Sequence, residues 1–108
     1  MDRLTKLLEF LSQAPKDAFN LYAVANEYMQ QGALEEAKKY FLQLKELHPD
    51  YVGLYYHLGK IYFLQENFEQ AKLVYEEGIT QAKQAKDLHA EGELQRALRQ
   101  AMDELEEW

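Results

Sequence analysis

The chain has 108 residues, which is the length of one ordinary domain with a single continuous core. Nineteen acidic and twelve basic side chains give it a formal net charge of −7, which disfavours nucleic acid and anionic membrane surfaces as partners. The sequence has no cysteine, which excludes disulfides and thiolate metal sites, and no apolar run near the roughly 20 residues of a membrane span, so we expect a cytoplasmic protein without a membrane partner.

The first predicted element is an amphipathic helix over residues 2–13. The stretch from Leu7 to Pro15 repeats the spacing from Phe41 to Pro49, so this helix corresponds to the second helix of a repeating unit. We therefore expect a half-repeat, a second-type helix without its partner. Four leucines at spacings of three and four should face inward, namely Leu4, Leu7, Leu8 and Leu11.

A single repeat period organises the next part of the chain. It is the distance along the sequence between the two prolines, Pro15 and Pro49. Further positions recur at the same offset: Tyr28 as Tyr62, Ala37 as Ala71, and Phe41 as Tyr75. The period predicts two repeats of two helices each, over residues 18–51 and 52–85.

In the repeat over residues 18–51, boundary residues mark both helices. Asp17 is a suitable N-cap for the first helix, Gly32 can adopt the left-handed conformation that ends it, and Pro49 stops the second helix. The apolar residues that share one face of each helix are Leu21, Val24, Ala25 and Tyr28 in the first, and Leu34, Ala37, Phe41 and Leu44 in the second.

The repeat over residues 52–85 follows the same plan. Its turn falls at Glu66-Asn67, where we expect the asparagine to take the conformational role of the glycine. Small residues such as Gly59 and Ala71 stand where the two helices must approach closely, because a larger side chain would push them apart. The remaining inward residues are Tyr55, Leu58 and Tyr62, then Phe68 and Tyr75.

The last predicted helix covers residues 87–107 and differs from the repeats. It carries apolar residues at helical spacing with charged residues between them. At the positions of Tyr55, Leu58, Gly59 and Tyr62 it offers His89, Gly92, Glu93 and Arg96. This pattern is typical of the polar capping helix that ends a repeat array.

The repeating residues form recognisable motifs. The segment from Tyr55 to Tyr62 reads Y-x2-L-G-x2-Y and that from Ala71 to Tyr75 reads A-x3-Y, with Lys83 in the place of a proline. The earlier unit reads L-x2-V-A-x2-Y, then A-x3-F, then Pro49. These motifs and their period resemble the tetratricopeptide repeat, whose signature is W-x2-L-G-x2-Y, A-x3-F and P. The resemblance implies an all-α fold of about six antiparallel helices, arranged as helix-turn-helix repeats in a short right-handed α-solenoid, within one domain over residues 1–108.

No group of residues indicates catalysis or metal binding. The three histidines are isolated and none lies in a zinc-binding motif. His89 and Glu93 are spaced i, i+4, but two ligands fall short of the three or four that a zinc site needs. No phosphate-binding loop, nucleophile elbow or catalytic dyad is present. We expect no enzymatic activity, no cofactor and no metal.

The resemblance also implies a concave groove, lined by the first helices of the repeats, that holds an extended or helical peptide of a partner. Helical spacing assigns two sets of residues to this surface. The first set is Phe19, Tyr22, Asn26, Met29 and Gln30, with Ala23 among them; the second is Tyr56, His57, Lys60, Phe63 and Leu64, after Gly53. Aromatic rings with a few polar groups suit peptide recognition, although each ring could equally pack against a neighbouring helix.

We therefore predict a non-enzymatic protein–protein interaction module with a protein or peptide partner. One variant of the family grips the C-terminal carboxylate of chaperone tails with lysines, asparagines and an arginine. Asn26 stands at one of those positions, but the others hold Tyr22, His57, Asp87 and Glu91, which disfavours a chaperone tail. The alternative is an assembly protein that forms a homodimer through its terminal helices, with Trp108 as an anchor.

Overall fold

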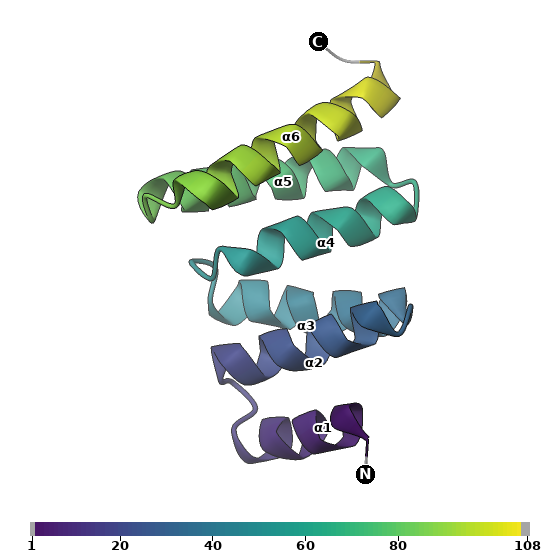
Figure 1. Ribbon diagram of the computed structural model, residues 1–108, viewed down its shortest axis with the longest axis vertical. Helices are drawn as coiled ribbons and strands as arrows, with labels where there is room; N and C mark the ends of the chain where they lie inside the picture. The colour runs from purple at the N-terminus through teal and green to yellow at the C-terminus, as the bar shows by residue number, and fades with distance from the viewer. Residues whose placement is uncertain (1, 107–108) are drawn as a thin grey trace. The chain divides into compact units, whose positions relative to one another are not determined.

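The computed structural model describes residues 2–106, and all the regular structure in that range is helical (Figure 1). The helices are α1 (Arg3–Gln13), α2 (Ala18–Gln30), α3 (Leu34–Leu47), α4 (Gly53–Leu64), α5 (Phe68–Gln84) and α6 (Leu88–Leu105). The expected all-α architecture with six helices is thus confirmed. Contacts group the helices into two compact units, with the first unit ending at Tyr51 and the second starting at Val52.

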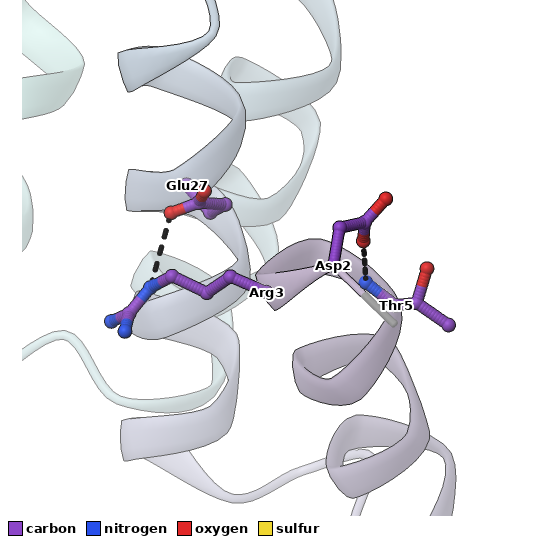
Figure 2. Close-up of polar contacts among 4 residues, drawn as sticks. All are labelled: Asp2, Arg3, Thr5 and Glu27. Atoms are coloured by element: carbon purple, nitrogen blue, oxygen red, sulfur yellow. Dashed lines mark hydrogen bonds and ion pairs between the residues drawn. The ribbon is translucent and has the colours of Figure 1, made fainter.

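Polar side chains fix where four of the described helices begin. Each accepts a hydrogen bond from the backbone N–H three residues later, a donor that has no partner inside the helix. Figure 2 shows this contact at α1, where the Thr5 N–H donates to Asp2 Oδ1 at 2.8 Å. The capping residues are Asp2 for α1, Asp17 for α2, Asn67 for α5 and Asp87 for α6.

The first unit consists of α1, α2 and α3, with α2 in contact with both of the others. The small residues predicted at close helix approaches, Ala25 and Ala37, are fully buried. In α1 the predicted inward face is only partly covered, because Leu11 is buried whereas Leu4, Leu7 and Leu8 are half-buried. An ion pair between Arg3 Nε and Glu27 Oε2, 3.2 Å long, also links α1 to α2 (Figure 2).

The second unit consists of α4, α5 and α6, and α5 lies alongside both of the others (Figure 1). Two glycines allow these close approaches. A β-carbon at Gly59 would overlap the ring of Tyr75, and one at Gly78 would stand 2.5 Å from Tyr55 Cβ and 3.1 Å from Leu94 Cδ1. Gly59 was predicted to have this role, whereas Gly78 was not singled out by the sequence pattern.

The turn inside each of the two repeats contains one residue with a positive φ, but in the second repeat this residue is not the one that was predicted. Gly32 has a positive φ of 78°, and its counterpart one period later, Glu66, has a φ of 61°. Asn67 has a φ of −93° and caps α5, where its side chain accepts a hydrogen bond from the Gln70 N–H. The expectation that asparagine replaces the glycine is therefore wrong: Glu66 adopts the left-handed conformation, because Asn67 is needed as the N-cap.

The second helices of the repeats differ in length. The α3 helix has 14 residues and ends at Leu47, two residues before Pro49. The α5 helix carries Lys83 where the proline was expected and extends to Gln84, for 17 residues in all. The α6 helix follows after residues 85–87 and packs through Leu94, Ala97 and Ala101. The α6 helix ends at Leu105, followed by Glu106 in the left-handed conformation.

Candidate functional site

The predicted groove residues of the first unit lie along α2. Phe19 has 66% of its surface exposed, and Gln30 is exposed as well. Tyr22, Asn26 and Met29 are half-buried, whereas Ala23 is buried and offers no surface to a ligand. We name the five accessible residues, Phe19, Tyr22, Asn26, Met29 and Gln30, the α2 face.

Tyr22 is held in place by two other rings. Its ring lies edge-on to Phe41, with centroids 6.1 Å apart, and 5.3 Å from the ring of Tyr51. Burial raises the pKa of the Tyr51 hydroxyl, and the nearby carboxylate of Asp17 adds to this shift. A ring that is fixed on two sides and half-exposed loses little conformational freedom when a ligand packs on it. Sequence reasoning missed Tyr51, because its only signal was its position directly before the next helix.

The predicted residues of the second unit lie along α4. Leu64 is 52% exposed, Gly53 is exposed, and Tyr56, His57, Lys60 and Phe63 are half-buried. The ring of Phe63 lies edge-on to Phe68, with centroids 5.1 Å apart. We name the five predicted side chains, Tyr56, His57, Lys60, Phe63 and Leu64, the α4 face.

A cleft of about 240 Å³ opens beside the α4 face, between α4 and α6. Tyr56 forms the wall of the cleft on α4. The centroid of the Tyr56 ring lies 5.9 Å from that of His57 and 6.5 Å from that of Tyr75. The other wall is one stripe of α6 at helical spacing, made of Glu93, Arg96, Ala97 and Gln100. The cleft therefore combines an aromatic ring with an acid, a base and an amide.

The α6 residues of this cleft were not assigned to a site from the sequence. Glu93 was interpreted as an incomplete metal site with His89 and, like Arg96, as a departure from the repeat signature. A useful signal was present, because residues 93, 96, 97 and 100 are spaced i, i+3, i+4 and i+7 and so share one helical face. That signal shows which residues lie together on α6 but not that α4 lies opposite them.

Burial shifts the protonation of two side chains near the cleft. Desolvation lowers the pKa of His57 below its usual 6.5, and the carboxylate of Glu93 opposes this shift. Desolvation raises the pKa of the Tyr75 hydroxyl well above its usual range, and Tyr56 adds to the effect. At neutral pH both groups are uncharged, so the charges at the cleft are those of Glu93 and Arg96.

No grouping of three or more metal-binding side chains occurs among residues 2–106. His89 is exposed at the start of α6, and Glu93 turns toward the cleft with Tyr56. Within the described part of the chain, no helix is long and apolar enough to cross a membrane. Trp108, the predicted anchor for self-association, lies outside the described residues.

Comparisons with known proteins agree with this architecture. A family model described as TPR repeat matches residues 25–66, and one described as tetratricopeptide repeat matches residues 52–84. A search of curated protein sequences gives no match.

Solved structures include several similar folds. A tetratricopeptide repeat domain protein from Salinibacter ruber, solved in solution by NMR, is 37% identical with a TM-score of 0.77, over 82% of this chain and 90% of that one. The Sgt2 TPR domain from Aspergillus fumigatus is 25% identical with a TM-score of 0.78, over 95% and 66% of the two chains. The TPR2B domain of yeast Sti1, in a complex with pHsp70, has the same fold at 16% identity, with a TM-score of 0.87 over 93% and 80%.

The motifs at a fixed period, the paired helices and the 37% identity to the Salinibacter ruber domain all indicate the same family. The chain belongs to the tetratricopeptide repeat family.

Proposed function

We propose that the chain is a non-enzymatic protein–protein interaction module that binds a peptide or a helix of a partner through its α2 and α4 faces. Tetratricopeptide repeats are in general interaction modules, and the fold supports that class of function. The finer statement, that these two faces hold the ligand, rests on the side chains that they present.

The observation that carries the proposal is the cleft between α4 and α6. Its wall on α4 is a tyrosine ring braced by Tyr75, a buried side chain, so the ring is a rigid apolar surface. Glu93, Arg96 and Gln100 face it with groups that accept or donate hydrogen bonds. A peptide offers both donors and acceptors along its backbone, so a wall of mixed polarity beside a ring suits it better than a wall of one charge would.

The side chains of the cleft also indicate which kind of peptide segment it would bind. An acid and a base in one small cleft favour a polar or mixed-charge segment with an apolar side chain for Tyr56. The clamp that holds a carboxylate tail is not proposed, because Asp87 and Glu91 stand at two of its positions and would repel a carboxylate. Complex formation with pHsp70 is stated for the Sti1 domain, which shares only 16% identity with this chain.

A peptide selection tests the proposal directly. The 108-residue chain is immobilised and used to select from a library of random peptides displayed on phage. We expect enriched peptides to lose binding to the double variant Tyr56→Ala, Lys60→Ala and to Arg96→Ala. A matched control is Leu73→Ala on α5, which removes a half-exposed apolar side chain from outside both faces and should leave binding unchanged.

Circular dichroism and thermal melting establish that each variant is folded before binding is measured. Enriched peptides that bind the folded Tyr56 and Arg96 variants as well as they bind the parent would move the site away from the α4 face. The same variants can then be used to capture partners from the native lysate, with mass spectrometry to identify proteins that the parent retains and the variants lose.

We further propose a cytoplasmic location and partners other than nucleic acid or membranes, on the basis of the cysteine-free sequence and the net charge of −7. The alternative function is an assembly protein that dimerises through its terminal helices. It stays a prediction, because Trp108, the residue assigned to that contact, lies outside the described residues.

A further inference from the structure

The cleft between α4 and α6 has the dimensions of a site for one side chain. Its volume of about 240 Å³ lies below the roughly 300–1,000 Å³ of pockets that enclose a whole small-molecule ligand. The ring of Tyr56 forms one wall, and the other wall consists of Glu93, Arg96, Ala97 and Gln100. The chemistry of these two walls therefore indicates which side chain of a peptide the cleft accepts.

Of the two charged residues that line the cleft, Glu93 is the one partly withdrawn from solvent. Glu93 is half-buried, whereas Arg96 is exposed. Within residues 2–106, Glu93 takes part in no ion pair. A carboxylate that gives up part of its hydration is stabilised by a cation, so Glu93 favours a positively charged group in the cleft.

Neither of the bases nearest to Glu93 supplies that cation. His57 on α4 is close enough for the carboxylate to favour the imidazolium, but burial has the larger effect and lowers the pKa of His57. The imidazole is therefore uncharged at neutral pH. The Nη1 atom of Arg96 lies beside Gly92, 3.6 Å from the position that a β-carbon would occupy there, and Gly92 is outside the cleft. The carboxylate of Glu93 is thus left to a ligand.

The opposite wall favours a cation with a flat apolar surface. The face of a tyrosine ring is negative and attracts a cation that lies over it. The ring of Tyr56 lies against the buried Tyr75, with centroids 6.5 Å apart, so it is a fixed platform. Arginine combines an aliphatic stem with a planar guanidinium, which stacks on aromatic rings and pairs with a carboxylate through two parallel hydrogen bonds. One arginine supplies both the apolar contact for Tyr56 and the positive charge for Glu93.

The charge of the chain also favours such a ligand. The formal net charge is −7, and acids outnumber bases among residues 52–106. A surplus of negative charge attracts a basic segment and speeds its association. The bases near the cleft, Arg96 and Lys60, are hydrogen-bond donors that suit the backbone carbonyls of the same peptide or an acid beside its arginine. The segment as a whole therefore has mixed charge.

We propose that the α4–α6 cleft is a specificity site for arginine, in which the guanidinium of a partner peptide stacks on Tyr56 and pairs with Glu93. This inference rests on the proposed peptide binding and adds to it the residue that decides which peptides bind. Lysine should bind less well, because its ammonium is a point charge that lacks the planar fork of arginine.

Two parallel selections from the phage library of random peptides test the proposal. One selection uses the parent chain, and the other uses Glu93→Arg, which reverses the charge at the cleft. We expect arginine to be enriched at one position of the peptides that bind the parent. The variant should instead enrich aspartate or glutamate at that position, because the sign of the charge in the cleft has changed.

Peptides enriched on the parent are then measured one at a time by fluorescence anisotropy. Replacing the arginine of the peptide by glutamine, or Glu93→Gln in the protein, should each weaken binding about tenfold. Both changes together should cost little more than either alone, since they remove the same contact. Glu76→Gln removes the same charge from an exposed position on α5, outside the cleft, and should bind like the parent. Circular dichroism establishes that each variant is folded.

The outcomes distinguish the arginine site from the proposed function. Some peptides could lose binding to the Tyr56→Ala, Lys60→Ala double variant and yet show no preference for arginine, or bind Glu93→Gln as tightly as the parent. Either result would keep the α4 face as the peptide site and overturn the arginine site. A selection that enriches no peptide, or only peptides that bind the double variant as well as the parent, would overturn both.

Discussion

The ring of Tyr75 lies directly against the backbone of Gly59, where a β-carbon would stand 2.6 Å from Cδ1 and 2.7 Å from Cζ and would overlap Cε1. The two residues join α4 to α5 within the second unit. Tyr75 is buried and its ring also meets Tyr56, so it has little room to retreat. The ring that supports the α4 face thus depends on the absence of a side chain at residue 59.

Gly59→Ala should therefore destabilise the protein, although alanine is the better helix former. Overpacking of this kind costs about 1–3 kcal/mol, which exceeds the gain of up to about 1 kcal/mol from helix propensity. The free energy of unfolding, measured by urea titration of the circular dichroism signal, should fall, and a displaced Tyr75 should also weaken peptide binding at Tyr56. An equally stable Gly59→Ala variant would show that the tyrosine ring can move aside at no cost.

Gly92→Ala is the matched change at a helical glycine with free space around it. The nearest atom to a β-carbon at residue 92 is Nη1 of Arg96, at 3.6 Å, which is an ordinary contact. Because the added β-carbon overlaps no atom, the main effect is the higher helix propensity of alanine. We expect the free energy of unfolding to rise by about 0.5–1 kcal/mol. The same urea titration measures it, and a loss of stability would indicate a constraint at this position beyond the space around it.

The contrast between these glycines shows what the sequence could and could not predict. The repeat period predicted where the helices of the repeats lie and that two helices approach closely at Gly59. Both predictions depend only on residue size and helical spacing, which can be read from the sequence. The role of Gly78 was not predicted, because its counterpart in the other repeat is Leu44 and the comparison of the repeats gave no sign of a close approach. The α4–α6 cleft was missed for a related reason: α6 departs from the repeat signature, with His89, Gly92 and Glu93 at signature positions, and this departure hides its equivalence to α2.

Glu66→Gly should stabilise the turn between α4 and α5. Glu66 has a φ of 61°, and this left-handed conformation costs a residue with a β-carbon roughly 1–2 kcal/mol. Glycine removes that strain but adds freedom to the unfolded chain, so we expect a net gain of a few tenths to about 1 kcal/mol. Gly32→Ala, at the equivalent turn with a φ of 78°, should lose stability by a similar mechanism. A pair of variants that shift the melting temperature in the same direction would contradict this account of the turns.

The stability of the second unit should depend on pH through His57. Burial lowers its pKa below 6.5, so between the two pKa values the unfolded chain binds a proton that the folded chain does not. The stability that comes from the neutral imidazole is fully present above about pH 6.5 and is lost as the pH falls toward the pKa of the folded state. Other groups titrate in acid as well, so the contribution of His57 has to be isolated by substitution.

His57→Gln isolates it, because glutamine keeps a polar side chain at this position and does not titrate. We expect the free energy of unfolding of the parent, relative to that of His57→Gln, to fall as the pH decreases below 6.5. Glu93→Gln removes the carboxylate that favours the imidazolium, so it should lower the pKa of His57 further and extend the pH range over which stability is lost. Urea titrations across this pH range measure the first effect, and the NMR titration of the His57 ring protons measures the second. A pH dependence that is identical in the parent and in His57→Gln would show that the histidine is hydrated in the folded protein and contributes nothing to the acid sensitivity.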